Sequence, residues 1–319
     1  MDALSTLFYA LVFPGFLFLA LLALLFQYID RKVVARVQGR IGPPLLQPLA
    51  DFVKLLGKEV ISPEGSDSRV LSAAPLVALA AVFAAFLLMP VSGPSPLGFA
   101  GDLPVALYLL TLPTVIMLVV GFASKSAYTS LGGARAVTLL FIYEVPFYFA
   151  LLAPAIAAGS WSVGEIVDWQ SGNGLLVLSQ PLALAVALVG LQAKLERAPF
   201  DIAEAETELI AGPWTELTGR RLAVMRLSFD AALVAGCVLV ALLFLGGGAL
   251  PGDPHPYWLV AVAAVLLKAF LVALVLIVVR AAFGRLRVDQ FSSFGWRVLA
   301  PAAVLQVFVV LVTVGGGWP

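Results

Sequence analysis

Long apolar runs separated by short polar connections dominate the chain. Runs of at least about 18 residues, the length expected of a membrane span, lie near 4–28, 69–92, 104–123, 136–158, 175–193, 224–248, 257–282 and 298–317. About 20 helical residues, each rising about 1.5 Å, cross a hydrocarbon core of about 30 Å. The pattern predicts an all-α polytopic membrane protein, with eight transmembrane helices forming a single domain over residues 1–319.

Residues 45–60 follow a different pattern from these long runs. Apolar side chains recur there at spacings of three and four, while charged residues occupy the other faces. The apolar set is Leu45, Leu49, Phe52, Val53, Leu56 and Val60. We expect an amphipathic helix that lies at the membrane interface or packs against a docked partner, and the two interpretations are compatible.

Composition agrees with the apolar pattern. The chain is 61% hydrophobic and 12% charged, about half the charged fraction of a soluble domain. A net charge of zero excludes a general polyanion binder, so no nucleic acid is expected as a partner. One cysteine, Cys237, and one histidine, His255, cannot build a zinc, iron–sulfur or haem site. Any redox cofactor is therefore expected in another chain, and Cys237 is expected to pack between helices.

The lysines and arginines predict an orientation. Eighteen of the nineteen lie in the connections after predicted spans 1, 3, 5 and 7 or directly beside them, and the other three connections hold none. By the positive-inside rule, those four connections face the cytoplasm and both termini are external. We therefore expect a multi-pass protein of the cell's inner (plasma) membrane.

Acidic residues gather in one connection, residues 194–221, between the fifth and sixth spans. Six of the nineteen acids of the chain lie there, namely Glu196, Asp201, Glu204, Glu206, Glu208 and Glu216. Basic residues bracket them, so this segment is too charged for hydrocarbon and is expected in the cytoplasm or in a watery cavity within protein. A merely solvated loop would explain the charges, but not the Pro-Phe-Asp turn followed by acids on one short segment.

Three charged residues lie more than one helical turn inside predicted spans. Lys268 lies near the middle of the seventh span, where a charge costs about 2.5–3.5 kcal/mol, so it is expected to face the bundle interior with a partner. Glu144 in the fourth span is the expected partner, and Asp230 in the sixth would continue a polar line towards the acidic segment. We interpret the three residues as an ion path, and a buried structural ion pair is the alternative.

Three stretches carry a resemblance to a known family. They are DRKVVARVQGRIGPPLLQPLADFVKLLGKE at 30–59, SLGGARAVTLLFIYEVP at 130–146 and ERAPFDIAEAETELIAGPWTELTG at 196–219. With the eight predicted spans, they resemble the H subunit of bacterial complex I (subunit 1 in mitochondria), the NADH-quinone oxidoreductase subunit that joins its two arms. They are also similar to the equivalent subunit of energy-converting membrane-bound nickel–iron hydrogenases.

The resemblance implies a subunit without cofactors that is not catalytic alone. Iron–sulfur clusters, together with a flavin or a nickel–iron centre, would belong to peripheral-arm subunits docked on the cytoplasmic loops. Small membrane subunits and antiporter-like subunits would be further partners. In complex I these loops form much of the quinone chamber, and buried acids begin the polar path to the pumping subunits.

Site residues carry over by position in the matching stretches. The acidic coupling loop and quinone chamber would be Glu196, Arg197, Asp201, Glu204, Glu206, Glu208 and Glu216. The charged first-loop positions would be Arg31, Arg36 and Glu59, and Glu144 after Tyr143 would match the family's glutamate in the fourth span.

Departures from the pattern leave the branch open. The first loop has the short IGPPLLQP version of the hydrogenase and ferredoxin-linked branch, whereas Arg135-Ala136 follows complex I. The predicted function is coupling of NADH- or ferredoxin-linked electron transfer, to quinone or to protons, with translocation of protons or sodium. The alternatives are the equivalent membrane component of a hydrogen-evolving nickel–iron hydrogenase and, more remotely, a stand-alone secondary transporter.

Overall fold

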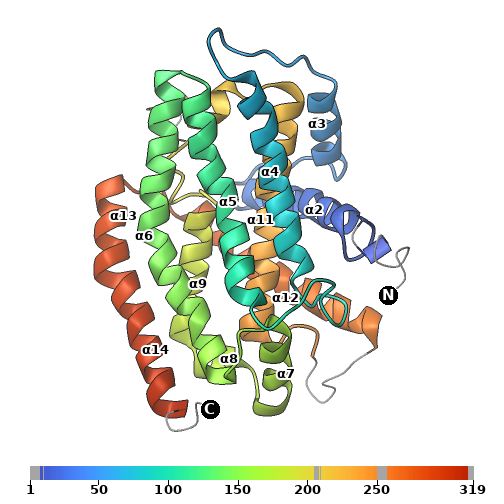
Figure 1. Cartoon of the computed structure of the whole chain (residues 1–319), viewed down its shortest axis with the longest axis vertical. Helices are drawn as coiled ribbons and strands as arrows, with labels where there is room; N and C mark the ends of the chain where they lie inside the picture. The colour runs from blue at the N-terminus through green and yellow to red at the C-terminus, as the bar shows by residue number, and fades with distance from the viewer. Residues whose placement is uncertain (1–7, 10, 205–207, 209, 250–256, 315–319) are drawn as a thin grey trace.

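The computed structural model describes residues 8–9, 11–204, 208, 210–249 and 257–314, and these residues form a helical bundle without strands (Figure 1). The longer helices are α2 (Phe16–Val37), α4 (Ser68–Leu87), α5 (Asp102–Ala123), α6 (Ala127–Ala158), α9 (Pro181–Lys194), α11 (Gly219–Leu245), α12 (Trp258–Ala282) and α14 (Ala300–Val314). The shorter ones are α3 (Gln47–Leu56), α7 (Val163–Asn173), α8 (Leu176–Ser179), α13 (Val288–Phe294), a 3-10 turn at Gly212–Glu216 and a π turn at Gly295–Leu299. The predicted all-α class is confirmed.

Helix α11 forms the centre of the bundle. It packs against α2, α4 and α12, and residues 231–244 are buried without interruption. A helix that is apolar on every side can be covered completely by its neighbours, which explains this position. Cys237 is fully buried within this stretch and packs between helices, as predicted.

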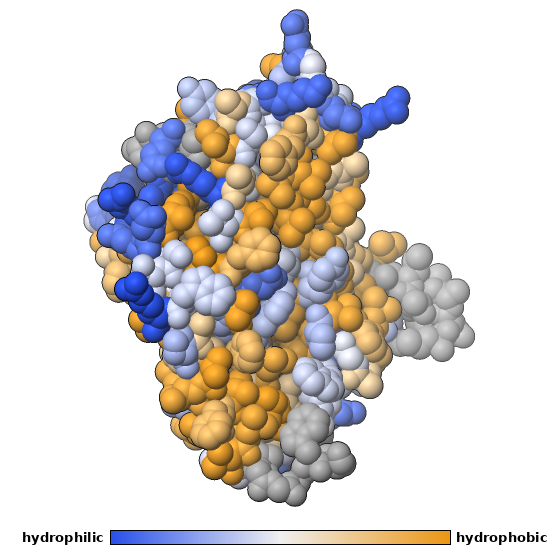
Figure 2. Space-filling view, turned by 60° about the vertical axis from the view of Figure 1, so that its left-hand side comes forward, coloured by the Kyte–Doolittle hydropathy of each residue, from blue (hydrophilic) through white to orange (hydrophobic). Residues whose placement is uncertain are grey.

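Six of the described helices are long and apolar enough to cross a membrane. They are Ser68–Leu87, Asp102–Ala123, Ala127–Ala158, Gly219–Leu245, Trp258–Ala282 and the continuous unit Val288–Thr313. They correspond to six of the eight predicted spans. The last unit begins about ten residues before its predicted start at 298, because α13, the π turn and α14 run on as one helix. In Figure 2 one side of the bundle is broadly apolar, with polar residues gathered at its upper end and along one edge.

The other two predicted spans need correction. The fifth, 175–193, is broken at Gln180, because Pro181 disfavours helical backbone in the residue before it. Only α9, 14 residues long and so about 21 Å, remains as a shorter apolar helix. The first span was predicted to end at 28, yet α2 continues to Val37 with the charged residues Asp30, Arg31, Lys32 and Arg36. The bundle therefore has six long spans, one shorter apolar helix and a first helix that ends in charge.

The amphipathic stretch forms α3, which is shorter than the predicted 45–60. Leu49, Val53 and Leu56 on its apolar face are exposed, in keeping with an interfacial or partner-covered helix, and what covers them stays a prediction. The segment after α3 is hydrogen-bonded to the start of α11. The Thr218 hydroxyl accepts from the Ile61 N–H and donates to the Ile61 carbonyl. Arg221 donates to the Ser62, Ser68 and Ser72 hydroxyls. The first loop and the acidic segment are thereby held together.

Candidate functional site: a charged chamber between the helices

Glu196 is the first acid of the acidic segment and lies two residues after α9 ends at Lys194. Its backbone has a φ of 50°, and Gln192 holds the returning chain by donating to the Ala198 carbonyl at 2.6 Å. The Glu196 side chain is 3% exposed, and neither carboxylate oxygen has a hydrogen-bond partner among the described residues. Burial, with the nearby Glu204 carboxylate, raises the pKa of Glu196 to about 8. Glu196 is therefore a buried acid that holds a proton at neutral pH.

A network of charges lies beside Glu196 and joins four parts of the chain. Asp30 of α2 lies between Arg197 of the acidic segment, 3.2 Å from Nη1, and Arg280 of α12, which donates to its other oxygen. Asp230 of α11 lies 4.0 Å from Arg197 and accepts a hydrogen bond from Gln27 at 2.6 Å. These contacts hold α2, α11 and the end of α12, which are far apart in sequence, around one point.

The network borders a cavity of about 470 Å³. Nine of its fifteen lining residues are ionisable: Asp30, Arg31, Glu196, Arg197, Asp201, Glu204, Arg226, Asp230 and Arg280. A second cavity of about 330 Å³ shares Asp30, Arg31 and Arg280 with it and reaches the turn at 40–43. We call the two together the charged chamber. Side chains so charged hold water or polar ligands more readily than apolar ones.

Trp214 and Arg285 position two further acids of the chamber. The Trp214 indole donates to Glu204, whose pKa burial raises above its usual range. Arg285 forms a two-pronged ion pair with Asp201, at 2.9 and 3.0 Å, and this pair raises the pKa of the guanidinium. Asp201 and Glu204 are thereby held on the wall of the chamber.

Four of the other predicted loop residues, all within the described part of the chain, lie outside the chamber. Glu208 is exposed, and an ion pair with Arg135 lowers the pKa of its carboxyl. Glu216 is half-buried and, among the described residues, forms no ion pair, while Glu206 lies outside the described residues. Arg36 and Glu59 are exposed and do not line the chamber.

Arg31 is the one predicted first-loop residue that lines the chamber. It forms a 2.7 Å ion pair with Asp51 of α3 and lowers the pKa of that carboxyl.

The predicted pairing of Lys268 with Glu144 is wrong. Lys268 Nζ donates instead to the carbonyls of Gly247 and Ala249, both at 2.7 Å, just beyond the end of α11. Carbonyls left free at a helix end attract cations, which explains why this lysine meets the C-terminal end of α11 rather than Glu144. Glu144 accepts instead from Thr111 at 2.8 Å and from Tyr148 at 2.6 Å. Asp230, by contrast, lines the chamber together with three acids of the acidic segment, and its part in an ion path stays a prediction.

Sequence reasoning missed Asp30 and Lys194. Asp30 is 3% exposed and carries two ion pairs, while Lys194 is 5% exposed and donates to Thr111 at 2.7 Å. Both stand at the edge of an apolar run, where a charged residue looks like a solvated flank. One feature of the sequence indicates that these two residues belong to the helices. No turn residue separates either of them from its apolar run, and both helices include these positions.

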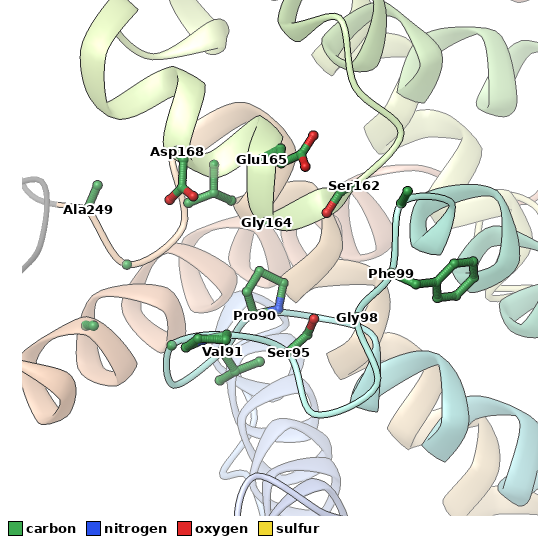
Figure 3. Close-up of a pocket in the computed structure, with 16 residues that line it drawn as sticks. Pro90, Val91, Ser95, Gly98, Phe99, Ser162, Gly164, Glu165, Asp168 and Ala249 are labelled. Atoms are coloured by element: carbon green, nitrogen blue, oxygen red, sulfur yellow. The ribbon is translucent and has the colours of Figure 1, made fainter.

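A larger cavity, about 650 Å³, lies beside the C-terminal end of α11. Figure 3 shows Glu165 and Asp168 of α7 on one side of it and Pro90, Val91 and Ser95 on the other. None of the predicted site residues lines it. Within the described part of the chain, no three His, Cys, Asp or Glu side chains converge as a metal site would require.

The close approach of α6 to the acidic segment depends on glycine. A Cβ at Gly132 would lie 2.7 Å from Pro213 Cδ and 2.8 Å from Gly212 Cα. We expect Gly132→Ala to destabilise the protein by about 1–3 kcal/mol, because the backbone of the segment would have to shift. Gly172→Ala, in α7 with open space around it, is the control and is expected to be neutral or slightly stabilising. Thermal unfolding of the purified complex measures both, and equal melting temperatures would contradict the packing argument.

The fold and chamber define the class: a polytopic α-helical membrane protein with ionisable groups gathered around a cavity between its helices. Comparisons narrow this class. A family model described as NADH dehydrogenase matches residues 10–311. The NADH-quinone oxidoreductase H subunit numbered 2 of Syntrophobacter fumaroxidans is 36% identical over 316 residues, covering 94% of this chain and 92% of the relative. The H subunit of the same oxidoreductase from Brevibacillus brevis is 35% identical, covering 90% of this chain and 87% of the relative.

One solved structure of a respiratory membrane complex is similar to this chain in fold. A chain of the membrane-bound sulfane sulfur reductase, an archaeal respiratory membrane complex, superposes with a TM-score of 0.86 at 29% identity. The match covers 96% of this chain and 99% of that chain. The chain described here belongs to the H-subunit family of NADH-quinone oxidoreductases.

Proposed function

We propose that this chain couples electron transfer in a docked redox arm to ion movement across the plasma membrane, with both termini outside. The observation that carries the proposal is the charged chamber, in which the buried Glu196 lacks a partner among the described residues while Glu204 lies nearby. Clustered acids share protons, so a change of charge next to the chamber changes how many protons they hold. The chain itself contributes proton-holding groups, and the redox centres belong to partner subunits.

The partners we propose follow from the family and the exposed surfaces. A peripheral-arm subunit with iron–sulfur clusters would dock on the loops that form the chamber. Small membrane subunits and antiporter-like subunits would cover the apolar flanks, where α6 leaves Glu144 half-buried among the exposed Phe141, Val145 and Phe149. A carboxylate facing lipid is costly, which favours a protein neighbour at this position.

The electron acceptor has two candidates, each favoured by one observation. The names of the NADH-quinone oxidoreductase relatives suggest a quinone as the acceptor. The chamber continues to the turn at 40–43, and this continuation would give a quinone an entry route. The mostly charged lining suits protons and water better than a quinone ring, and favours an acceptor held by a partner, as in a hydrogenase or the sulfane sulfur reductase.

Activity of the purified native complex separates the candidates. Inhibitor-sensitive quinone reduction would make the chamber a quinone site. Hydrogen evolution or sulfur reduction from reduced ferredoxin, without quinone reduction, would make it a proton-coupling element. Failure of the chain to purify with any redox partner would overturn the coupling function in either form.

Glu196 gives the chamber a pH signature. Its pKa of about 8 lies above the ordinary value of 4.5, so between these values the unfolded chain ionises before the folded one. The stabilisation from the protonated carboxyl is complete below about pH 4.5 and is lost as pH rises through about 8. We expect Glu196→Gln to remove this loss, so that the variant gains melting temperature over the wild type at about pH 9 but not at about pH 5.

Glu208→Gln is the matched control for this pH signature. Glu208 is exposed, and its pKa is lowered by Arg135, so its carboxyl is ionised at both pH values in the folded protein. We expect a small change in melting temperature that is the same at both. Melting temperatures of the complex at the two pH values measure the effect, and an equal response of the Glu196 variant at both would contradict it.

A further inference from the structure

Lys194 is a buried cation in unusual surroundings. It ends α9 next to the chamber, and among the described residues no carboxylate lies within ion-pair distance of it. The rings of Tyr143, Phe147 and Tyr148 lie 5.6 to 5.9 Å from Nζ and provide attraction without accepting a proton. Its one hydrogen bond to a side chain is the 2.7 Å contact with Thr111 Oγ1.

Thr111 connects Lys194 to Glu144. Its Oγ1 lies 2.7 Å from Lys194 Nζ and 2.8 Å from Glu144 Oε1, so the hydroxyl can accept from the ammonium and donate to the carboxylate at once. The Leu107 carbonyl, at 3.0 Å, is the alternative acceptor of the same proton. Tyr148 donates to the same Glu144 oxygen at 2.6 Å. Base, hydroxyl and acid form a continuous hydrogen-bonded chain from the chamber end of α9 to α6.

We propose that Lys194 is the proton-exchanging base of the intramembrane path, with Thr111 as its link to Glu144. As an N–H bond of the ammonium breaks, Thr111 Oγ1 takes up that proton, while the hydroxyl proton of Thr111 passes to Glu144 Oε1. The ammonium becomes a neutral amine and the carboxylate a neutral acid, so no net charge appears. This inference rests on the coupling function proposed above and assigns the role to Lys194 that the sequence pattern gave to Lys268.

We expect the chamber to influence this exchange through charge. Glu196 lies two residues beyond Lys194 and lines the chamber. A negative charge on Glu196 favours the ammonium form of Lys194, and its protonation favours the neutral pair. A void of about 10 Å³ touches both Lys194 and the chamber residues Leu195 and Phe229, about the smallest space that holds one water. Events in the chamber thus change the proton held by Glu144.

Three variants of the native complex test the exchange. Thr111→Val keeps the shape and removes the hydroxyl, and Thr111→Ser restores a hydroxyl at the same atom. Lys194→Arg keeps the positive charge on a group that does not release its proton. Two readouts are the number of ions moved per electron in proteoliposomes and the protonated-carboxyl band in redox-difference infrared spectra, assigned with Glu144→Gln.

We expect the wild type and Thr111→Ser to move ions and to show the Glu144 carboxyl band. Thr111→Val and Lys194→Arg should lose the band and lower the ion-to-electron ratio by about tenfold or more. A purely structural cation would leave Lys194→Arg unchanged in both readouts, which would overturn the proposal. If the wild type moves no ions, the coupling function fails, but the infrared band still tests the proton exchange. A Glu144 band that is present with Thr111→Ser and absent with Thr111→Val supports the exchange. A band that is equal in all variants, or absent from the wild type, overturns it.

Discussion

Glu144→Gln is expected to abolish ion movement while the complex still assembles. Glutamine has nearly the same size and can still accept the hydrogen bonds from Thr111 and Tyr148, so packing is preserved. It can neither take up nor release a proton. Because a positioned proton-transfer group contributes about a hundredfold or more, we expect at least nine-tenths of the coupled ion movement to be lost. Ion uptake by proteoliposomes during electron transfer measures it.

Glu165→Gln is the matched control, because it makes the same chemical change in α7, at the cavity beside the C-terminal end of α11. Glu165 accepts from Ser160 and touches neither Lys194 nor the chamber. We expect wild-type ion movement in this variant. If Glu144→Gln removes the whole complex from the membrane, the carboxylate has a structural role, and the proposed path through α6 is wrong.

The apolar pattern was sufficient to predict the class and most spans, because apolar runs of membrane length follow from the thickness of the bilayer. It failed where local chemistry changed a helix. Pro181 divides the fifth run, and the first helix continues into charge because partners elsewhere in the chain neutralise that charge. Such partners lie up to 250 residues away in sequence, as Arg280 does from Asp30, and no local pattern reveals them.

The candidate site was predicted in part for the same reason. Glu196, Asp201 and Glu204 gather on one segment, so their sequence spacing alone places them together. Lys268 was misplaced because its position along a helix does not say which end of the neighbouring helix it meets. Lys194 was overlooked because its burial depends on aromatic rings of α6, which approach only once the helices pack.

Asp30→Asn is expected to be the most destabilising change in the chamber. The carboxylate is buried between Arg197 and Arg280. Its removal leaves Arg280 without an ion pair among the described residues and Arg197 with only the 4.0 Å contact to Asp230. Breaking a buried pair costs about 3–5 kcal/mol, and water in the adjoining chamber places the expected loss nearer the lower value. Asp289→Asn makes the same change in an 88% exposed pair with Arg287 and is expected to cost no more than about 1 kcal/mol.

A double-mutant cycle separates the ion network from simple loss of packing. Arg197→Met alone should also destabilise the complex, because Asp30 and Asp230 would both lose its charge. The double variant Asp30→Asn/Arg197→Met should lose clearly less stability than the two single variants together. The reason is that the second substitution removes a charge that the first left unpaired. Thermal unfolding of the three variants measures the coupling. Strict additivity would show that Asp30 and Arg197 act independently, and the chamber would then owe its shape to helix packing rather than to the charges that line it.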